Sequence, residues 1–157
     1  MDLVAGDARE ILLAIGLDDW SGLHDRNRFS GYLSLGGGMD PSWLDLFARA
    51  VRDISGRSTP IPFSEATCPL ESPAHLRLAK LGDRTIELVD RYWLDEIASL
   101  PDGLVGRVAA RWIDLVDVEE CRVEPDEKPM FRQVAGDLVE FCRVVHGAED
   151  VLFAWSI

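Results

Sequence analysis

The sequence predicts an α+β fold in which about five helices pack on a small sheet. Apolar residues recur at intervals of three and four over several capped segments, which is typical of helices with one buried face. Shorter β-rich runs predict strands, and the chain ends in an apolar run at 151–157. Helices and strands do not alternate strictly, which argues against a doubly wound fold. A chain of 157 residues has the size of one domain, so we expect a single globular domain over 1–157.

The N-terminal part predicts a helix, a strand and a second helix. The carboxylate of Asp7 can cap the first helix, which Gly16 ends. Residues 29–35 have the composition of a strand. Asp40 marks the start of the second helix and Gly56 its end. The core face of this helix carries Trp43, Leu44, Phe47, Val51 and Ile54.

Ion pairs are expected between charged residues about one helical turn apart. In the second helix, Arg49 has Asp45 on one side and Asp53 on the other. Further along the chain, Arg111 has Asp114 at the same kind of spacing. Side chains three or four residues apart are neighbours on a helix surface, so we expect intrahelical pairs.

The middle of the chain contains an ambiguous segment. Residues 57–72 are rich in Ser, Thr and Pro and show no period, so we expect a loop. A Ser-Pro pair then resembles a helix start, which leaves 73–81 open between a strand and a short helix. Gly82 suits the first central position of a type II′ turn, and the β-rich run 84–89 follows it. Together they favour a hairpin.

Three further helices and a closing strand complete the predicted fold. Asp90 can cap the first of these helices, and Pro101 separates it from the second. The last helix spans roughly 127–145. The run 151–157 is apolar on both alternating faces, which is typical of a strand buried on both sides. We expect its deletion to unfold the protein, because burying each large side chain is worth about 1.5–3 kcal/mol.

The charge balance restricts the partners. Sixteen basic residues against 28 acidic ones give a net charge of −12. Phosphate backbones and anionic lipid headgroups repel such a surface, so we expect neither nucleic acid nor membrane as a partner. Neutral small molecules, metals and basic proteins tolerate it. The simplest interpretation is that the charge keeps the protein soluble.

Cysteine usage and the N-terminus predict a reduced, cytoplasmic protein. Cys68, Cys121 and Cys142 are odd in number and form no C-x-x-C pair, which favours packed free thiols. The chain starts with an acid where a signal peptide has a base, and no apolar run approaches the length of a membrane span. Arginine far outnumbers lysine, which suggests a GC-rich bacterial source.

The glycines at 36–38 are the one feature that suggests a phosphate cradle. They stand between an expected strand and an expected helix start, where free N–H groups and the helix dipole favour an anion. Asp40, however, places a negative charge where the anion would lie, and no lysine is near. We therefore favour a tight connection, for which glycine is the default residue.

Nucleophile and metal motifs are absent from the sequence. Ser34 lacks the spacing of a nucleophile elbow. Cys68 and His75 have no third group to orient them. The histidines, which include His24 and His146, are scattered and form no zinc motif. We therefore predict no catalytic residue, no metal ligand and no cofactor.

The tryptophans mostly fall in predicted core stripes, at positions 43, 93, 112 and 155. Trp20 lies in polar sequence instead. It can be an exposed binding hot spot. The usual burial of tryptophan favours a ring that folds back onto the core.

Acidic residues concentrate in one stretch before the last helix. They are Asp117, Glu119, Glu120, Glu124, Asp126 and Glu127. The simplest interpretation is a solvated connector, because charge runs usually face water. The functional hypothesis is a docking surface, which makes the chain a protein-binding or inhibitor/immunity-type module for a basic partner, by analogy of size and charge only. The alternative is a small-molecule-binding protein or enzyme with a site assembled from distant residues, which a deep pocket with convergent polar groups would favour.

Overall fold

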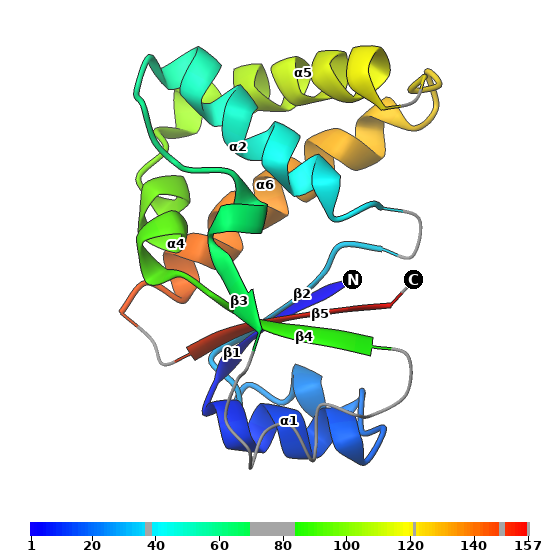
Figure 1. Ribbon diagram of the computed structural model, residues 1–157, viewed down its shortest axis with the longest axis vertical. Helices are drawn as coiled ribbons and strands as arrows, with labels where there is room; N and C mark the ends of the chain where they lie inside the picture. Colours follow the sequence, from blue (N-terminus) through cyan, green and yellow to red (C-terminus); the bar gives the residue numbers. More distant parts are fainter. Residues whose placement is uncertain (37–38, 70–83, 121, 148–149, 157) are drawn as a thin grey trace. The chain divides into compact units, whose positions relative to one another are not determined.

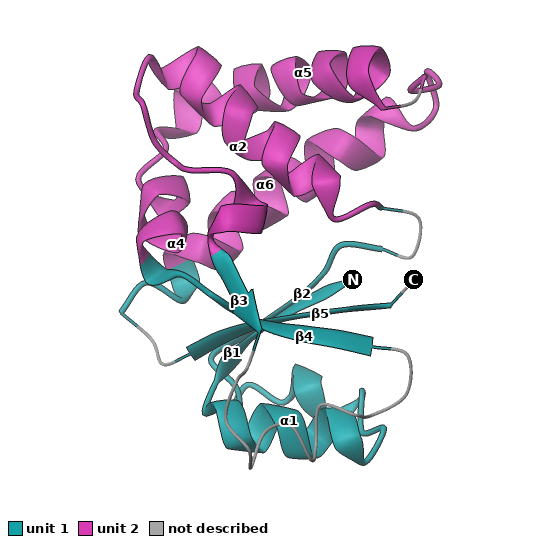
Figure 2. Ribbon diagram, viewed as in Figure 1, with its two compact units in different colours: residues 1–39, 67–91, 144–157 teal, residues 40–66, 92–143 magenta. Residues whose placement is uncertain are grey.

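The computed structural model describes residues 1–36, 39–69, 84–120, 122–147 and 150–156 (Figure 1). They form five α-helices and a five-stranded sheet that includes the C-terminal strand, which confirms the predicted α+β class. The chain divides into two compact units (Figure 2). Unit 1 comprises Met1–Met39, Thr67–Arg91 and Val144–Ile157, and unit 2 comprises Asp40–Ala66 and Tyr92–Arg143.

Unit 1 contains the sheet. Its strands are β1 (Asp2–Gly6), β2 (Gly31–Ser34), β3 (Thr67–Pro69), β4 (Arg84–Val89) and β5 (Asp150–Ser156). They are ordered β2-β1-β5-β4-β3, and every neighbouring pair is antiparallel. The C-terminal strand β5 is therefore the central strand. Its residues 151–154 are buried without alternation, which confirms the predicted strand buried on both sides.

Helix α1 (Ala8–Gly16) covers one face of this sheet. Asp7 Oδ1 accepts hydrogen bonds from the backbone N–H groups of Arg9 and Glu10, at 3.0 and 3.1 Å, so the predicted cap is confirmed. The apolar stripe of the helix packs with alternate residues of the strands. The buried cluster includes Ile11, Leu12 and Ile15 of α1 with Val4, Ile86, Leu152 and Ala154 of the sheet.

Two strands of unit 1 are missing from the sequence prediction. The first is β1, whose run of buried residues is too short to show a period of its own. The second is β3, three residues within the stretch 57–72 that was expected to be a loop. β3 is a strand because it pairs with β4, which the local sequence does not reveal. β4 itself is confirmed, and the proposed hairpin partner at 73–81 lies outside the described residues.

Unit 2 contains the other α-helices that the structure describes, apart from one terminal residue each of α4 and α6. They are α2 (Ser42–Ser55), α4 (Arg91–Ala98), α5 (Asp102–Glu119) and α6 (Lys128–Val144). Gly56 ends α2 with φ 70°, a left-handed conformation that glycine adopts without strain. The core centres on Trp112, whose Nε1 donates to the carbonyl of Trp43 at 2.8 Å. The rings of Phe47 and Phe131 pack edge-on against it.

The expected intrahelical ion pairs are wrong. Arg49 pairs with Glu119 of α5, with 2.6 Å between Nη1 and Oε1. Asp45 instead accepts hydrogen bonds from the backbone and hydroxyl of Ser64, and Asp53 is the ion-pair partner of Arg111. Helix α5 lies against α2, so the polar residues beside the contact reach across it rather than along their own helix.

None of the helices in the described part of the chain has both the length and the apolar character that crossing a membrane requires.

Candidate functional site

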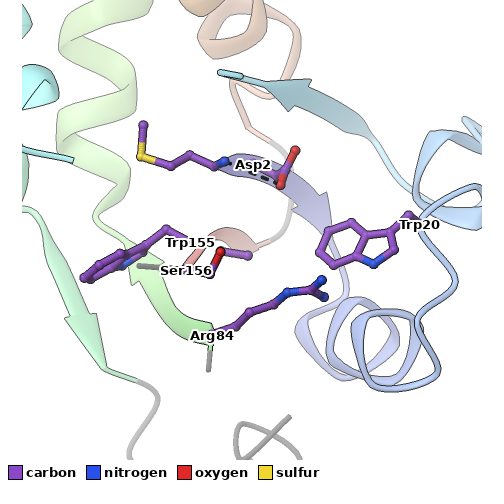
Figure 3. Close-up of a pocket in the computed structure, with 7 residues that line it drawn as sticks. Asp2, Trp20, Arg84, Trp155 and Ser156 are labelled. Carbon is purple, nitrogen blue, oxygen red and sulfur yellow. Dashed lines mark ion pairs between the residues drawn. The ribbon is translucent and has the colours of Figure 1, made fainter. Parts of the chain in front are cut away.

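A pocket of about 330 Å³ lies in unit 1, at one end of the sheet (Figure 3). The described residues that line it come from four separate parts of the chain. They are Met1, Asp2, Trp20, Arg84, Ala154, Trp155 and Ser156.

The antiparallel strand order explains why these residues meet. β1 and β4 begin at the end of the sheet where β5 finishes. Asp2 lies opposite Ala154, and Arg84 lies opposite Ser156. Side chains alternate along a strand, so these four residues share the face that α1 packs on. Trp155 belongs to the other face by its position in β5, although it is also among the lining residues.

Arg84 is held by the loop that follows α1. Its guanidinium carbon lies 4.2 Å from the ring centroid of Trp20. Arg84 Nη1 lies 3.7 Å from Asp18 Oδ1, and the same oxygen accepts a 2.6 Å hydrogen bond from Trp20 Nε1. Asp18 therefore fixes the indole, and the indole fixes the plane of the guanidinium. The Asp18 side chain is 80% exposed, so its attraction to Arg84 is weakened by water.

Asp2 is held by Tyr32. The phenol donates to Asp2 Oδ1 at 2.7 Å. Burial, with the hydrogen bond and the charge of Asp2, raises the pKa of Tyr32 to about 12. Tyr32 therefore stays protonated at neutral pH and remains a donor, which leaves Oδ2 of Asp2 to face other groups.

The pocket presents the guanidinium of Arg84, the α-amino group of Met1, the carboxylate of Asp2, the hydroxyl of Ser156 and the indole of Trp20. This set suits binding. Within the described lining, no nucleophile stands beside a general base, which covalent catalysis requires. The described residues also contain no group of three or more His, Cys, Asp or Glu side chains that could hold a metal ion.

All six acidic residues predicted as a docking surface are exposed. Asp117 and Glu119 belong to the last turn of α5 and Glu120 is its C-cap, so the expected connector begins later than predicted. Glu124, Asp126 and Glu127 precede α6.

Part of this acidic stretch is tied to its own backbone. Asp117 Oδ1 accepts from the N–H of Val123 at 2.9 Å. Glu127 Oε2 accepts from the N–H of Glu124, also at 2.9 Å. Glu119 pairs with Arg49, as described above. These contacts tie Asp117, Glu119 and Glu127 to neighbouring groups while the six acidic residues remain exposed.

The cysteines and histidines do not form a site among the described residues. Cys142 is buried, as predicted. Cys68 is exposed on the short edge strand β3, so of the two interpretations, a packed or an incidental thiol, the packed one does not hold for it. Cys121 and His75 lie outside the described residues. His24 is exposed, with its ring centroid 4.1 Å from that of Tyr32.

The glycine connection at 36–38 and the burial of the tryptophans were also predicted from the sequence, and the structure tests them in part. Gly36 has φ 87°, the positive value expected of a tight connection, and residues 37–38 lie outside the described part. Trp20 packs against the core of unit 1, which confirms the preferred prediction. Trp93 and Trp112 are fully buried, whereas Trp43 and Trp155 are half-buried.

The pocket residues were missed because each is isolated in the sequence. Asp2, Arg84 and Ser156 belong to no motif, and only strand pairing brings them together. Trp20 alone carried a usable signal, as an aromatic residue in polar sequence. Comparisons of the chain with protein-family models, with curated proteins and with solved structures give no match.

Proposed function

We propose that this chain is a protein-binding module that docks a basic partner through an acidic surface. We define the acidic surface as Val118 together with Asp117, Glu119, Glu120, Glu124, Asp126 and Glu127. The observation that supports the proposal most directly is Val118. Val118 is apolar, yet its side chain is 81% exposed. Acidic residues flank it on both sides. An apolar centre with a polar rim is the usual anatomy of a protein interface.

The position of these acids supports a role other than stability. A helix C-terminus carries a partial negative charge, and acids there destabilise it by about 0.3–1 kcal/mol each. The last turn of α5 contains no basic residue to offset this. Local choices that oppose stability are concentrated at functional sites.

The net charge of −12 adds a long-range contribution. A negative field attracts a basic partner and raises the association rate, and salt screens that attraction. The proposal therefore predicts binding that is fast at low salt and weakened at high salt.

The test compares two triple variants of the full chain with the same net charge. The first, Glu120→Gln, Glu124→Gln and Asp126→Asn, neutralises the acidic surface. The control, Glu10→Gln, Asp114→Asn and Asp137→Asn, neutralises exposed acids elsewhere. Each is used with the unmodified chain in quantitative pull-downs from lysate at low and high salt.

We expect a salt-sensitive protein that the unmodified chain and the control retain and the first variant loses. Val118→Ser should also weaken its capture, because it removes the apolar contact. Equal loss in both triple variants would show that overall charge, and not this surface, attracts the partner.

A small-molecule-binding protein is the second candidate, and the pocket of unit 1 is the observation that favours it. Its volume of about 330 Å³ lies at the lower end of the range for ligand sites. Its polar groups converge from distant parts of the chain, as the alternative hypothesis requires.

A further inference from the structure

We infer that the unit 1 pocket binds a small zwitterion with no net charge. The ligand's carboxylate binds Arg84, its ammonium group binds Asp2, and its apolar body lies against Trp20 (Figure 3). This inference rests on the second candidate function and is independent of docking through the acidic surface.

Arg84 is prepared to receive a carboxylate. A guanidinium has five N–H donors in a planar fork that matches the two oxygens of a carboxylate. Among the described residues, the guanidinium is engaged by the face of Trp20 and by the 3.7 Å ion pair with Asp18. Neither contact is a hydrogen bond, so the fork keeps its donors for a ligand. The stacking on Trp20 fixes the plane in which that ligand must lie.

Asp2 is prepared to receive an ammonium group. Its Oδ1 is fixed by the phenol of Tyr32, and its side chain is only 19% exposed. The α-amino group of Met1 lies 3.9 Å from Oδ2, which is beyond hydrogen-bond length (Figure 3). A ligand ammonium at hydrogen-bond distance would interact more strongly with this carboxylate than that loose pair does.

The charges of the pocket and of the whole chain favour a net-neutral ligand. A simple anion would satisfy Arg84 and the α-amino group of Met1 but would be opposed by Asp2 and by the net charge of −12. A simple cation would satisfy Asp2 but would be opposed by Arg84 and by that α-amino group. A zwitterion satisfies both groups and has no net interaction with the long-range field.

The indole of Trp20 defines the apolar part of the ligand. Its ring nitrogen is bonded to Asp18. The polar atom of this side chain is thus engaged by the protein, and the ring offers apolar surface to the pocket. Aromatic or aliphatic groups bind such surface well. The expected ligand class is therefore an α-amino acid, or a molecule of that chemistry, with an apolar side chain.

The experiment titrates the full chain by calorimetry with matched probes. The zwitterions are phenylalanine and leucine. N-acetylphenylalanine retains only the carboxylate, and phenylalanine methyl ester retains only the ammonium group. We expect a zwitterion to bind at least about tenfold more tightly than either modified probe, the loss typical of a missing charged hydrogen bond.

Variants locate the binding. Arg84→Gln and Asp2→Asn should each weaken zwitterion binding by about tenfold or more. Arg28→Gln is the matched control, because Arg28 also lies over a ring, that of Phe29 at 5.1 Å, and pairs with Asp19 at 3.6 Å, outside the pocket. It should bind as the unmodified chain does. If Arg84→Gln does not fold, Arg84→Lys keeps the charge without the fork and should still weaken binding.

Four results would overturn the inference. Equal binding of phenylalanine and its N-acetyl form would remove the role of Asp2. Equal weakening in Arg28→Gln and Arg84→Gln would place the ligand elsewhere. Binding of uncharged aromatic molecules alone, lost in Arg84→Gln, would refute the ligand class but leave the second candidate function standing. If none of the probes or uncharged aromatics binds up to about 10 mM, both the ligand class and the second candidate function are refuted.

Discussion

Asp53 of α2 accepts a forked contact from Arg111 of α5, with Nε and Nη2 each 2.8 Å from Oδ2. The sequence predicted Asp114 as the partner of Arg111, three residues along the same helix. Both side chains of the observed pair are 36% exposed, so water moderates their attraction. The pair joins two helices of unit 2 and therefore affects tertiary packing rather than the stability of α5 alone.

A double-mutant cycle should measure this preference. Arg111→Gln combined with Asp53→Asn should show a coupling of about 0.2–1 kcal/mol in the free energy of unfolding, as exposed pairs do. Arg111→Gln combined with Asp114→Asn should show a coupling near zero. Denaturant unfolding gives both values. A larger coupling for Asp114 would mean that the intrahelical pair dominates in solution.

The central strand should be the most sensitive part of unit 1. Leu152 is fully buried between the neighbouring strands and α1. Leu152→Ala should cost about 2–5 kcal/mol, because it removes apolar contacts and leaves a cavity. Leu17→Ala, at a 71% exposed position, should cost no more than about 0.5 kcal/mol. Thermal and denaturant unfolding compare the two, and removal of residues 151–157 should abolish the folded state. A truncated chain that melts normally would refute the central role of β5.

The two units should unfold together if the chain is one domain, as the sequence predicts. Neither unit is a continuous piece of sequence, because the chain passes between them four times. We expect Leu152→Ala in unit 1 to lower the melting temperature of unit 2 as well. Hydrogen exchange followed separately in α5 and in β5 gives the measurement. Protection that falls in β5 but is unchanged in α5 would show two independent domains.

Tyr32 should make stability fall at alkaline pH. Its pKa is raised from 10.0 to about 12 by burial, with further contributions from Asp2. The folded state therefore keeps a proton that the unfolded state loses above pH 10. The resulting stabilisation is complete below pH 10 and is lost as the pH rises through about 12. Phenolate absorbance in a Tyr92→Phe background isolates the titration of Tyr32. Asp2→Asn should lower the pKa part of the way, since burial remains. An unchanged pKa would mean that burial alone is responsible.

The thiols of Cys68 and Cys142 should differ strongly in reactivity. Cys68 is exposed, whereas Cys142 is fully buried in α6 and burial raises the pKa of its thiol. Thiolate is the reactive form, so iodoacetamide should modify Cys68 in the native protein and spare Cys142. Peptide mass mapping before and after denaturation compares the two positions. Modification of Cys142 at the rate of Cys68 would show that α6 opens readily.

The helices were the predictable part of the fold. Asp7 caps α1 and Gly56 ends α2 as their residue types predict, because capping depends on groups within a few residues of each other. The strands were less predictable. β3 has three residues and no pattern of its own, and it exists only because β4 lies beside it.

The two candidate sites also differ in how far the sequence could predict them. The acidic surface could be predicted, since its six acids are close together in the chain and charge keeps them in water. The exposure of Val118 among them could not, because the same residue type is more often buried. Of the pocket residues, only Trp20 had an advance signal in the sequence.

The sequence by itself determined the described helices, the Asp7 cap of α1, the end of α2 at Gly56, the burial of the last strand and the strongly negative charge. All of these depend on neighbouring residues or on composition. Only the tertiary structure decided which strands pair, which carboxylates Arg49 and Arg111 contact, and that Asp2, Arg84 and Ser156 line one pocket. Those outcomes depend on hydrogen bonds and packing between residues far apart in the chain, and such contacts leave no local pattern in a single sequence.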